Sequence, residues 1–348
     1  MNSSCKEIVE SDDLFDRVPD EIVRSIFNKL HDAKSLCSSM AVCKRFHSIA
    51  PQVDQIYLPI PQKKAAVKEF DKNFFNSVVV KTLMKPLHFI SQMIKSKSRN
   101  DDDDLDFCSY HVPDELLKPF EEIRGLHLRL PCHGNQKLGF KIGKSSKNLT
   151  TFLRWKAEFG RELHSCVMIG AKSRSKKLEN EDKHESGRES VVMSEPELKL
   201  RIVWTISCLI AASARHYLIQ DTVKSQKMIE NVVISDESDQ GRLCMNKEQI
   251  DELKGLKGKG DEVLEYRSRV PALRMKMWYL ERLELPDSGE VMEGATLVVI
   301  RPAGGGGGEG RSDADLVDAA AFGEEVLGEA ARKLMVAKRC YTLEMNSF

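Results

Sequence analysis

The chain has no net charge. Its 53 Lys and Arg residues balance its 53 Asp and Glu residues over 348 positions. Without a charge excess there is no global attraction for nucleic acid or for an anionic membrane, and a basic patch can only be local. We therefore expect no nucleic acid and no membrane among its partners.

Long apolar runs are also absent. The longest largely apolar stretch runs from Ile202 to Ala214, which is 13 residues, whereas a transmembrane helix needs about 20. Met1 to Glu10 has neither the basic nor the apolar region of a secretory signal. The expectation is a soluble, intracellular protein.

The nine cysteines lack any C-x-x-C pair. In a reducing compartment such scattered residues are small core residues or surface thiols. Cys108 with His111 and Cys132 with His133 offer four potential zinc ligands, but not in the paired spacing of a zinc knuckle. We expect no metal and no cofactor.

Motifs of catalysis and phosphate binding are missing as well. No Gly-Lys-Ser/Thr follows the glycines at 304–310, and there is no G-x-S-x-G nucleophile elbow. The acidic run Asp101 to Asp104 lacks the spacing of a calcium loop. We expect a protein that is not an enzyme. An active site assembled in space within residues 51–302 stays open as an alternative.

What the chain does contain is enough apolar material, 41%, for a sizeable core, and its length suggests about two domains. Stretches poor in apolar residues or rich in glycine divide it. The predicted organisation is a disordered N-terminus at 1–13, a helical unit at 14–51, a mixed α/β domain at 52–302 with a disordered insertion at 171–190, a Gly-rich linker at 303–312 and a C-terminal helix at 313–348.

The first unit has helical periodicity. Pro19 suits a first helical turn, and Asp20 and Glu21 suit the positive end of its dipole. Asp32 can cap a second short helix, and Pro51 ends a third. So small a unit buries little surface and needs a partner. The first helix carries one apolar face, made of Ile22, Val23, Ile26, Phe27 and Leu30.

A strand-like spacing then recurs four times, with a leading apolar residue as in leucine-rich repeats. The intervals are irregular, so we predict buried strands with helical connections; four chance matches are the alternative. Ser194 and Glu197 form a potential capping box before a buried helix at 198–219, and residues 274–285 and 291–301 form a predicted hairpin. Ser312 and Asp315 can open a further helix. The four copies of the spacing are Val53-Ile56-Leu58, Ile123-Leu126-Leu128, Leu163-Cys166-Met168 and Ile229-Val232-Ile234.

The helical unit resembles the F-box motif over about a tenth of the chain. The matching residues are Val18-Pro19, Asp20-Glu21-Ile22, Ile26-Phe27, Leu30, Leu36 and Val42-Cys43-Lys44-Arg45-Phe46. Val18 replaces the usual Leu, and Phe46 stands where many F-boxes have Trp; both changes keep apolar character.

The remainder is similar to a plant group, the auxin-upregulated F-box proteins. The resemblance rests on three stretches of the chain. These are Gln52-Val53-Asp54 with Leu58, Leu153-Arg154-Trp155-Lys156 with Ser165-Cys166-Val167, and Val291 through Gly294-Ala295-Thr296-Leu297-Val298-Val299 to Arg301-Pro302.

The resemblance implies a non-catalytic substrate receptor of an SCF-type ubiquitin ligase, active in the nucleus, the cytoplasm or both. It implies that the F-box binds a Skp-type adaptor, that cullin and RING subunits join indirectly, and that an unknown protein substrate is recruited. The alternative is an F-box scaffold outside any cullin ligase. The adaptor-binding residues expected on this basis are Leu14, Phe15, Val18, Pro19, Ile22, Leu36, Val42, Cys43 and Phe46.

The opposing interpretation is that these side chains only close a local core against residues 51–90, which applies most to Ile22, Ile26 and Leu30. For the substrate, the alternation of the strands singles out side chains on the far side of the sheet. Each of them is equally compatible with an ordinary surface position. They are Gln55, Tyr57, Arg124, His127 and Arg129.

Overall fold

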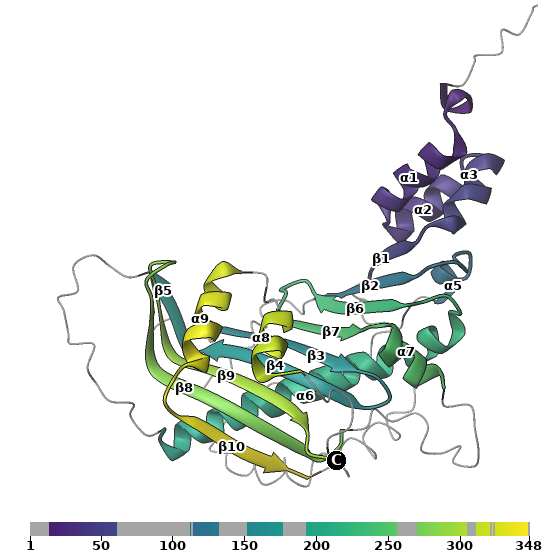
Figure 1. The fold of residues 1–348 in the computed structure, drawn as a ribbon. Coiled ribbons are helices and arrows are strands. Elements are labelled where there is room, and N and C mark those ends of the chain that lie inside the picture. The colour runs from purple at the N-terminus through teal and green to yellow at the C-terminus, as the bar shows by residue number, and fades with distance from the viewer. Residues whose placement is uncertain are drawn as a thin grey trace, which may run out of the picture.

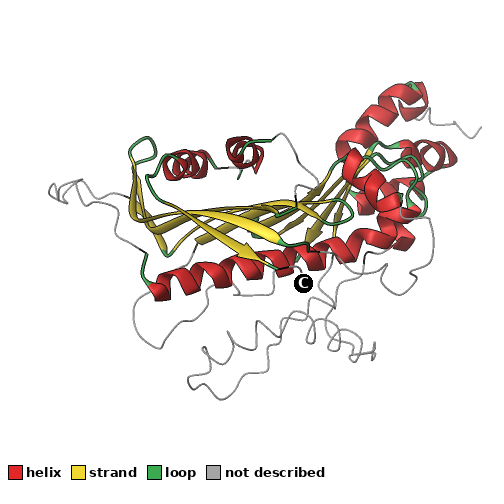
Figure 2. Cartoon of the chain, turned by 60° about the horizontal axis from the view of Figure 1, so that its bottom comes forward, coloured by secondary structure: helices red, strands yellow, loops and turns green. Residues whose placement is uncertain are grey.

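A computed structural model describes residues 14–60, 112, 114–131, 152–176, 193–255, 270–304, 311–320, 322 and 324–346. Small helices stand at one end of a ten-stranded mixed sheet. A long helix runs along one sheet face, and two shorter helices lie on the other (Figure 1, Figure 2). The predicted fold class, a helical N-terminal unit followed by a mixed α/β domain, is confirmed.

The helical unit comprises η1 (Leu14–Arg17), α1 (Asp20–Leu30), α2 (Ala33–Met40), α3 (Lys44–Ile49) and η2 (Ala50–Gln52). Pro19 stands at the N-cap of α1, followed by two acidic residues, as the sequence predicts. Asp32 caps α2 by accepting a hydrogen bond from the backbone N–H of Ser35 at 2.8 Å. The helix starts therefore follow local sequence chemistry.

The sheet runs in the order β1-β2-β6-β7-β3-β4-β9-β8-β10, with β5 paired to β9. Strands β1, β2 and β6 are parallel neighbours, and the half from β3 to β10 is antiparallel. The strand bounds are β1 (Gln55–Pro59), β2 (Gly125–Leu130), β3 (Phe152–Phe159), β4 (Leu163–Ala171), β5 (Ser173–Lys176), β6 (Asn231–Asp236), β7 (Gly241–Met245), β8 (Leu273–Leu285), β9 (Glu290–Pro302) and β10 (Cys340–Met345).

All four copies of the recurring spacing lie at strands, and three of them stack on one another. Ile56 pairs with Leu126, which pairs with Val232, so the copies in β1, β2 and β6 are in register. The turn before each strand repeats too. The carbonyl of Asp54 accepts from Arg124 and Gly125, and that of Arg124 accepts from Glu230 and Asn231, at 2.8 and 2.9 Å in each case. The fourth copy, in β4, lies in the antiparallel half.

The long helix, α6 (Glu195–Ser225), extends beyond the predicted 198–219 and lies along one sheet face (Figure 2). By length and composition it is the one described helix that could cross a bilayer. Its buried side chains, Trp204 and Leu209 among them, instead belong to the core that it shares with the sheet. The predicted capping box is wrong: Ser194 makes no side-chain cap, and Glu197 bonds to Lys172 and Arg201.

The opposite face is covered over β4, β8 and β9 by α8 (Asp313–Ala320) and α9 (Glu325–Met335) (Figure 1). Strands β8 and β9 form the predicted hairpin, with Gly289 at φ 67° in its turn. Ser312 and Asp315 form reciprocal hydrogen bonds at the start of α8. Two further short helices, α5 (Asp114–Leu117) and α7 (Lys247–Lys254), complete the described chain.

Two segment predictions are wrong. The single helix predicted over 313–348 is α8, α9 and the edge strand β10, because its apolar side chains close a second core on the sheet. The insertion predicted to be disordered over 171–190 begins with β5, which gains backbone pairing with β9. Residues 177–190, the N-terminal 1–13 and 305–310 of the predicted linker lie outside the described residues.

Candidate functional site

The apolar residues of α1 divide into two faces. Val23 and Phe27 are buried in the core. Ile22, Ile26 and Leu30, spaced at i, i+4 and i+8, are 51%, 48% and 40% exposed. We call these three residues the α1 stripe. Its apolar arc is wider than three small helices can cover, so the stripe is left facing water.

Exposed apolar side chains are concentrated in this part of the molecule. Nine large apolar side chains are exposed in the described chain, and five of them lie between Phe15 and Val42. Phe15 is 54% exposed and Val42 is 70% exposed. Clusters of exposed apolar side chains are typical of surfaces that bind another protein.

Arg45 holds the segment that leads into α1. Its guanidinium donates to Asp20 at 2.8 Å, to the carbonyl of Phe15 at 2.6 Å and to the carbonyl of Val18. The Phe46 ring packs edge-to-face against both Phe15 and Phe27, with centroids 5.8 and 5.4 Å apart. The exposed Phe15 therefore stands on a fixed base.

The structure separates the predicted adaptor-binding residues. Leu14 opens η1, Pro19, Ile22, Val42 and Cys43 are exposed, and Val18 and Phe46 are half-buried. Leu36 is fully buried, so its assignment to an adaptor surface is wrong: as a residue of the α2 face turned inward it holds the unit together. Ile26 and Leu30, which the sequence favoured as internal, are on the surface.

The helical unit is tied directly to the sheet. Asn28 Nδ2 donates to the Asp54 carboxylate at 3.1 Å, and the Asp54 N–H donates to Asn28 Oδ1 at 2.9 Å. The N–H of Tyr57 in β1 donates to the carbonyl of His31, the residue that ends α1 at φ 34°. The two parts share one apolar core.

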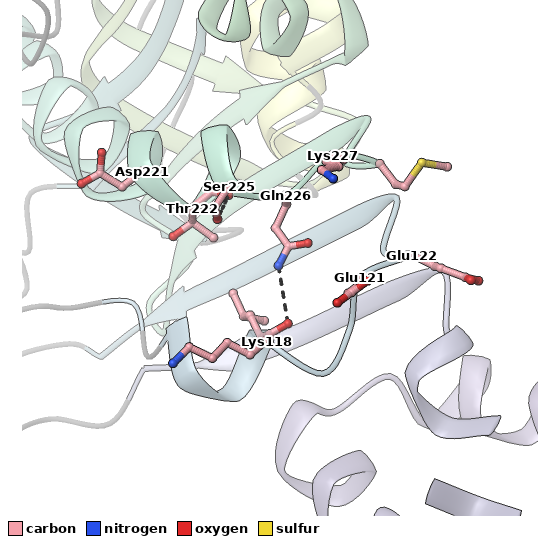
Figure 3. A pocket seen from close by; sticks show the side chains of 10 residues that line it. Lys118, Glu121, Glu122, Asp221, Thr222, Ser225, Gln226 and Lys227 are labelled. Carbon is pink, nitrogen blue, oxygen red and sulfur yellow. Dashed lines mark hydrogen bonds between the residues drawn. The ribbon is translucent and has the colours of Figure 1, made fainter. Parts of the chain in front are cut away.

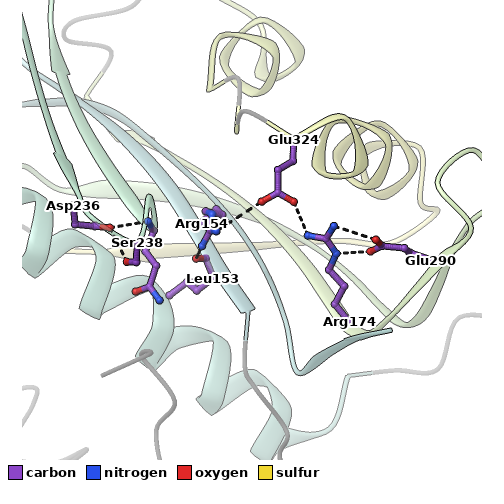
Figure 4. Close-up of polar contacts among 8 residues, drawn as sticks. Leu153, Arg154, Arg174, Asp236, Ser238, Glu290 and Glu324 are labelled. Carbon is purple, nitrogen blue, oxygen red and sulfur yellow. Dashed lines mark hydrogen bonds and ion pairs between the residues drawn. The ribbon is translucent and has the colours of Figure 1, made fainter. Parts of the chain in front are cut away.

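Ion pairs in the sheet domain hold elements together. Arg174 bridges Glu290 and Glu324, and Arg154 lies 3.7 Å from Glu324, which joins β3, β5 and β9 to the start of α9 (Figure 4). Under α6, Arg215 pairs with Asp236 at 2.6 Å. Burial alone would raise the pKa of Asp236, but Arg215 and nearby hydrogen bonds hold that pKa below its ordinary value.

An open groove of about 680 Å³ lies between α5 and the C-terminal end of α6 (Figure 3). Lys118, Glu121, Glu122 and Asp221 line it together with amide and hydroxyl groups. Ser225 Oγ donates to the backbone carbonyl of Thr222 at 2.9 Å, so this hydroxyl is not paired with a base. Among the described residues no cluster of three His, Cys, Asp or Glu side chains can hold a metal. Cys108, His111, Cys132 and His133 lie outside them.

Comparison with known proteins agrees with this geometry. An F-box-like family model matches residues 15–56. Over 97% of the chain, F-box protein At4g18380 of Arabidopsis thaliana is 36% identical, with 94% of its own length covered. The Arabidopsis F-box proteins AUF1 and AUF2 are 35% and 36% identical over 97% of this chain and the whole of theirs. No solved structure matches.

Proposed function

The chain belongs to the plant F-box proteins, and from that premise we propose that it is the substrate-recognition subunit of an SCF-type ubiquitin ligase. In this role the F-box binds a Skp-type adaptor, which links it to cullin and RING subunits. The rest of the chain recruits a protein for ubiquitination and proteasomal degradation. We place this activity in the nucleus, the cytoplasm or both.

The observation that supports the proposal is the α1 stripe, which lies within the segment matched by the F-box-like model. Full burial of a large apolar side chain contributes about 1.5–3 kcal/mol, so covering the exposed half of each stripe residue contributes about 1 kcal/mol. Phe15 and Val42 extend the apolar area. Together these side chains can offset the cost of association.

The chain would then perform no bond chemistry of its own. It would raise the concentration of a substrate lysine near the charged ubiquitin-conjugating enzyme, which is a proximity effect. The buried ionisable groups in the described part of the sheet domain suit this role, because they connect strands and helices and do not converge on a reactive group.

The test is binding of the full chain to a purified Skp-type adaptor, with Val18→Ala combined with Pro19→Ala as the variant. Pro19 is exposed at the start of α1 and Val18 is half-buried beside it. We expect adaptor binding to be abolished while the circular dichroism of the sheet domain is retained, since truncating an interface anchor costs about 2 kcal/mol or more. Unchanged capture of the adaptor by this variant would contradict the proposal.

A second measurement separates the ligase from a scaffold. The adaptor-bound chain is mixed with a cullin–RING complex and examined by size-exclusion chromatography. Co-elution of all components is expected for a ligase subunit. Adaptor binding without cullin recruitment would favour the alternative, an F-box scaffold acting outside a cullin ligase.

A further inference from the structure

One face of the sheet is only partly covered. Helix α6 runs along the other face, and α8 and α9 cover this one over β4, β8 and β9 (Figure 1, Figure 2). In the described chain no helix packs on this face over β2, β6 and β7. We call this region the open sheet face. Lys156 in β3 marks its border, because its Nζ donates to the carbonyl of Ala319 in α8 at 2.8 Å.

The strand register places two rows of side chains across the open sheet face. Each row crosses five strands in the order β1, β2, β6, β7 and β3. The first row is Pro59, Arg129, Ser235, Arg242 and Lys156, and the second is Tyr57, His127, Val233, Cys244 and Glu158. The predicted residues Gln55, Tyr57, His127 and Arg129 lie on this face, whereas Arg124 lies in the turn before β2.

Two guanidinium groups on this face form no ion pair with a carboxylate of the described residues. Within this part of the chain, Arg129 donates to the Tyr57 hydroxyl, at 3.4 Å, and to the carbonyl of Glu237, at 3.2 Å, and its buried Nε has no hydrogen-bond partner. Arg242 is exposed, and its guanidinium makes neither an ion pair nor a hydrogen bond with another described residue. The hydrogen bond with Tyr57 raises the pKa of Arg129, and the charges of Asp239 and Glu237 in the turn after β6 raise that pKa further.

Near α8 and α9, the charged side chains of the same face are paired. Lys156 pairs with Glu158 at 3.1 Å, and Glu158 also binds Arg311 at 2.8 Å. Arg154 and Arg174 are paired with Glu324 (Figure 4). Among the described residues of this face, the guanidinium groups that form no ion pair therefore lie in the part that α8 and α9 leave open.

Between the two arginines the surface offers hydrogen-bonding groups on a rigid base. His127 Nε2 lies 2.8 Å from Ser235 Oγ, and the His127 ring packs edge-to-face on Tyr57 with centroids 5.2 Å apart. Burial, followed by the charges of Arg242 and Arg129, lowers the pKa of His127. Arg129 and Arg242 stand two strands apart, which is about 10 Å.

We propose that the open sheet face is a docking surface for an acidic segment of a partner protein, whose carboxylates pair with Arg129 and Arg242. A guanidinium binds a carboxylate through two parallel hydrogen bonds, which fixes orientation as well as affinity. If the ligase function proposed above holds, this partner is the substrate. The surface borders the F-box, since the ring of His31 contacts that of Tyr57.

The test is selection of random peptides on the full chain bound to a Skp-type adaptor, followed by affinity measurements with the selected peptides. We expect enrichment of peptides with several Asp or Glu residues. Their affinity should fall with rising salt. Arg242→Glu, which removes no internal contact, should weaken binding at least about tenfold, and Arg129→Glu with Arg242→Glu should abolish it.

The matched control is Lys338→Glu with Arg339→Glu, which changes net charge equally on two exposed residues between α9 and β10. This control should leave peptide affinity unchanged. Selection of neutral or basic peptides, or equal binding by Arg242→Glu and the unaltered chain, would overturn the proposal.

Two other occupants give distinct results, and each would also overturn it. Self-association that Arg242→Glu abolishes would assign the face to a second copy of the chain. Peptide binding that appears only after Asp101–Asp104 are changed to Asn would assign it to the chain's own acidic run. Adaptor binding is recorded on the same samples, so failure of the F-box role and failure of the docking surface are distinguishable.

Discussion

The F-box and the sheet domain differ in which side chains they expose to water and which they bury. The F-box leaves Phe15, Val42 and the α1 stripe exposed, although all are apolar. The sheet domain buries polar and charged groups under α6, including Arg201, Arg215 and His216. Exposed apolar groups gain stability only when a partner covers them, whereas buried polar groups must be satisfied within the chain. The first pattern suits an interface and the second fixes one internal arrangement.

The largest effect is expected when charge is placed on the α1 stripe, which tests whether this apolar surface is an interface. Ile22→Asp with Ile26→Asp should reduce affinity for a Skp-type adaptor by about 4 kcal/mol, near a thousandfold, because two anchors are replaced by carboxylates that the interface must desolvate. The melting temperature should change little, since both side chains are already half-exposed. Binding by isothermal titration calorimetry checks this. A variant that unfolds would show that the stripe serves the core.

The reverse experiment removes a buried charge from the sheet domain. Arg201 is fully buried between Trp204 and Tyr279, and it donates to Glu197, to Thr296 and to the carbonyl of Gly294. Arg201→Ala should lower the free energy of unfolding by about 3–4 kcal/mol, because these acceptors lose their donor. Urea denaturation measures this. Adaptor affinity of the folded fraction should stay unchanged, since Arg201 lies in the N-terminal part of α6, and that end of the helix is far from the F-box (Figure 2).

Acid should act on the sheet domain through His216. Its Nε2 donates to the carbonyl of Gly160, its Nδ1 accepts from Gln220, and burial lowers its pKa from 6.5 to about 4. Between pH 6.5 and 4 the unfolded chain protonates this group and the folded chain does not. This residue's contribution is therefore complete above pH 6.5, and about 3 kcal/mol is lost as pH falls towards 4.

The measurement is urea denaturation across this pH range, with His216→Gln as the comparison. The loss assigned to His216 is the part of the pH slope that His216→Gln lacks. Equal slopes for the two proteins would show that His216 is protonated in the folded state.

The smallest expected loss of affinity tests how far the adaptor-binding surface of the F-box extends. Val42 is 70% exposed and outside the α1 stripe. Val42→Ala should weaken adaptor binding by about 1 kcal/mol, as expected for the loss of two methyl groups, and leave stability unchanged. Surface plasmon resonance resolves a change of this size. No change in affinity would exclude Val42 from the contact area.

The sequence predicted caps and turns more accurately than it predicted which side chains are buried. The cap at Asp32, the hairpin of β8 and β9 and the start of α8 follow from residues adjacent in the chain. Periodicity placed Ile22 and Phe27 on a single apolar face, and it cannot say where a small unit runs out of neighbours to cover that face. Leu36 was assigned to the adaptor surface from the F-box resemblance, although it is fully buried.

The pairing of strands that are distant in the sequence could not be predicted either. The spacing in β1, β2 and β6 indicated strands, but the sequence does not reveal that they are adjacent, since 100 residues lie between the end of β2 and the start of β6. Arg242 was not predicted as a surface-binding residue, because only its strand register opposite Ser235 places it on the open sheet face. Likewise β10 carries no strong strand signal of its own and forms because β8 offers a free edge.

The bonds between Asn28 and Asp54 and between His31 and Tyr57 leave no spacer between the F-box and the sheet. In the proposed ligase, a substrate held on the sheet would therefore keep a nearly fixed orientation relative to the adaptor. The orientation of the bound substrate, and not its diffusion on a flexible linker, would then determine which lysine accepts ubiquitin. Lysines on the wrong side of the same substrate would stay unmodified however long the complex lived, and a Gly-Ser insertion after Gln52 would make them accessible.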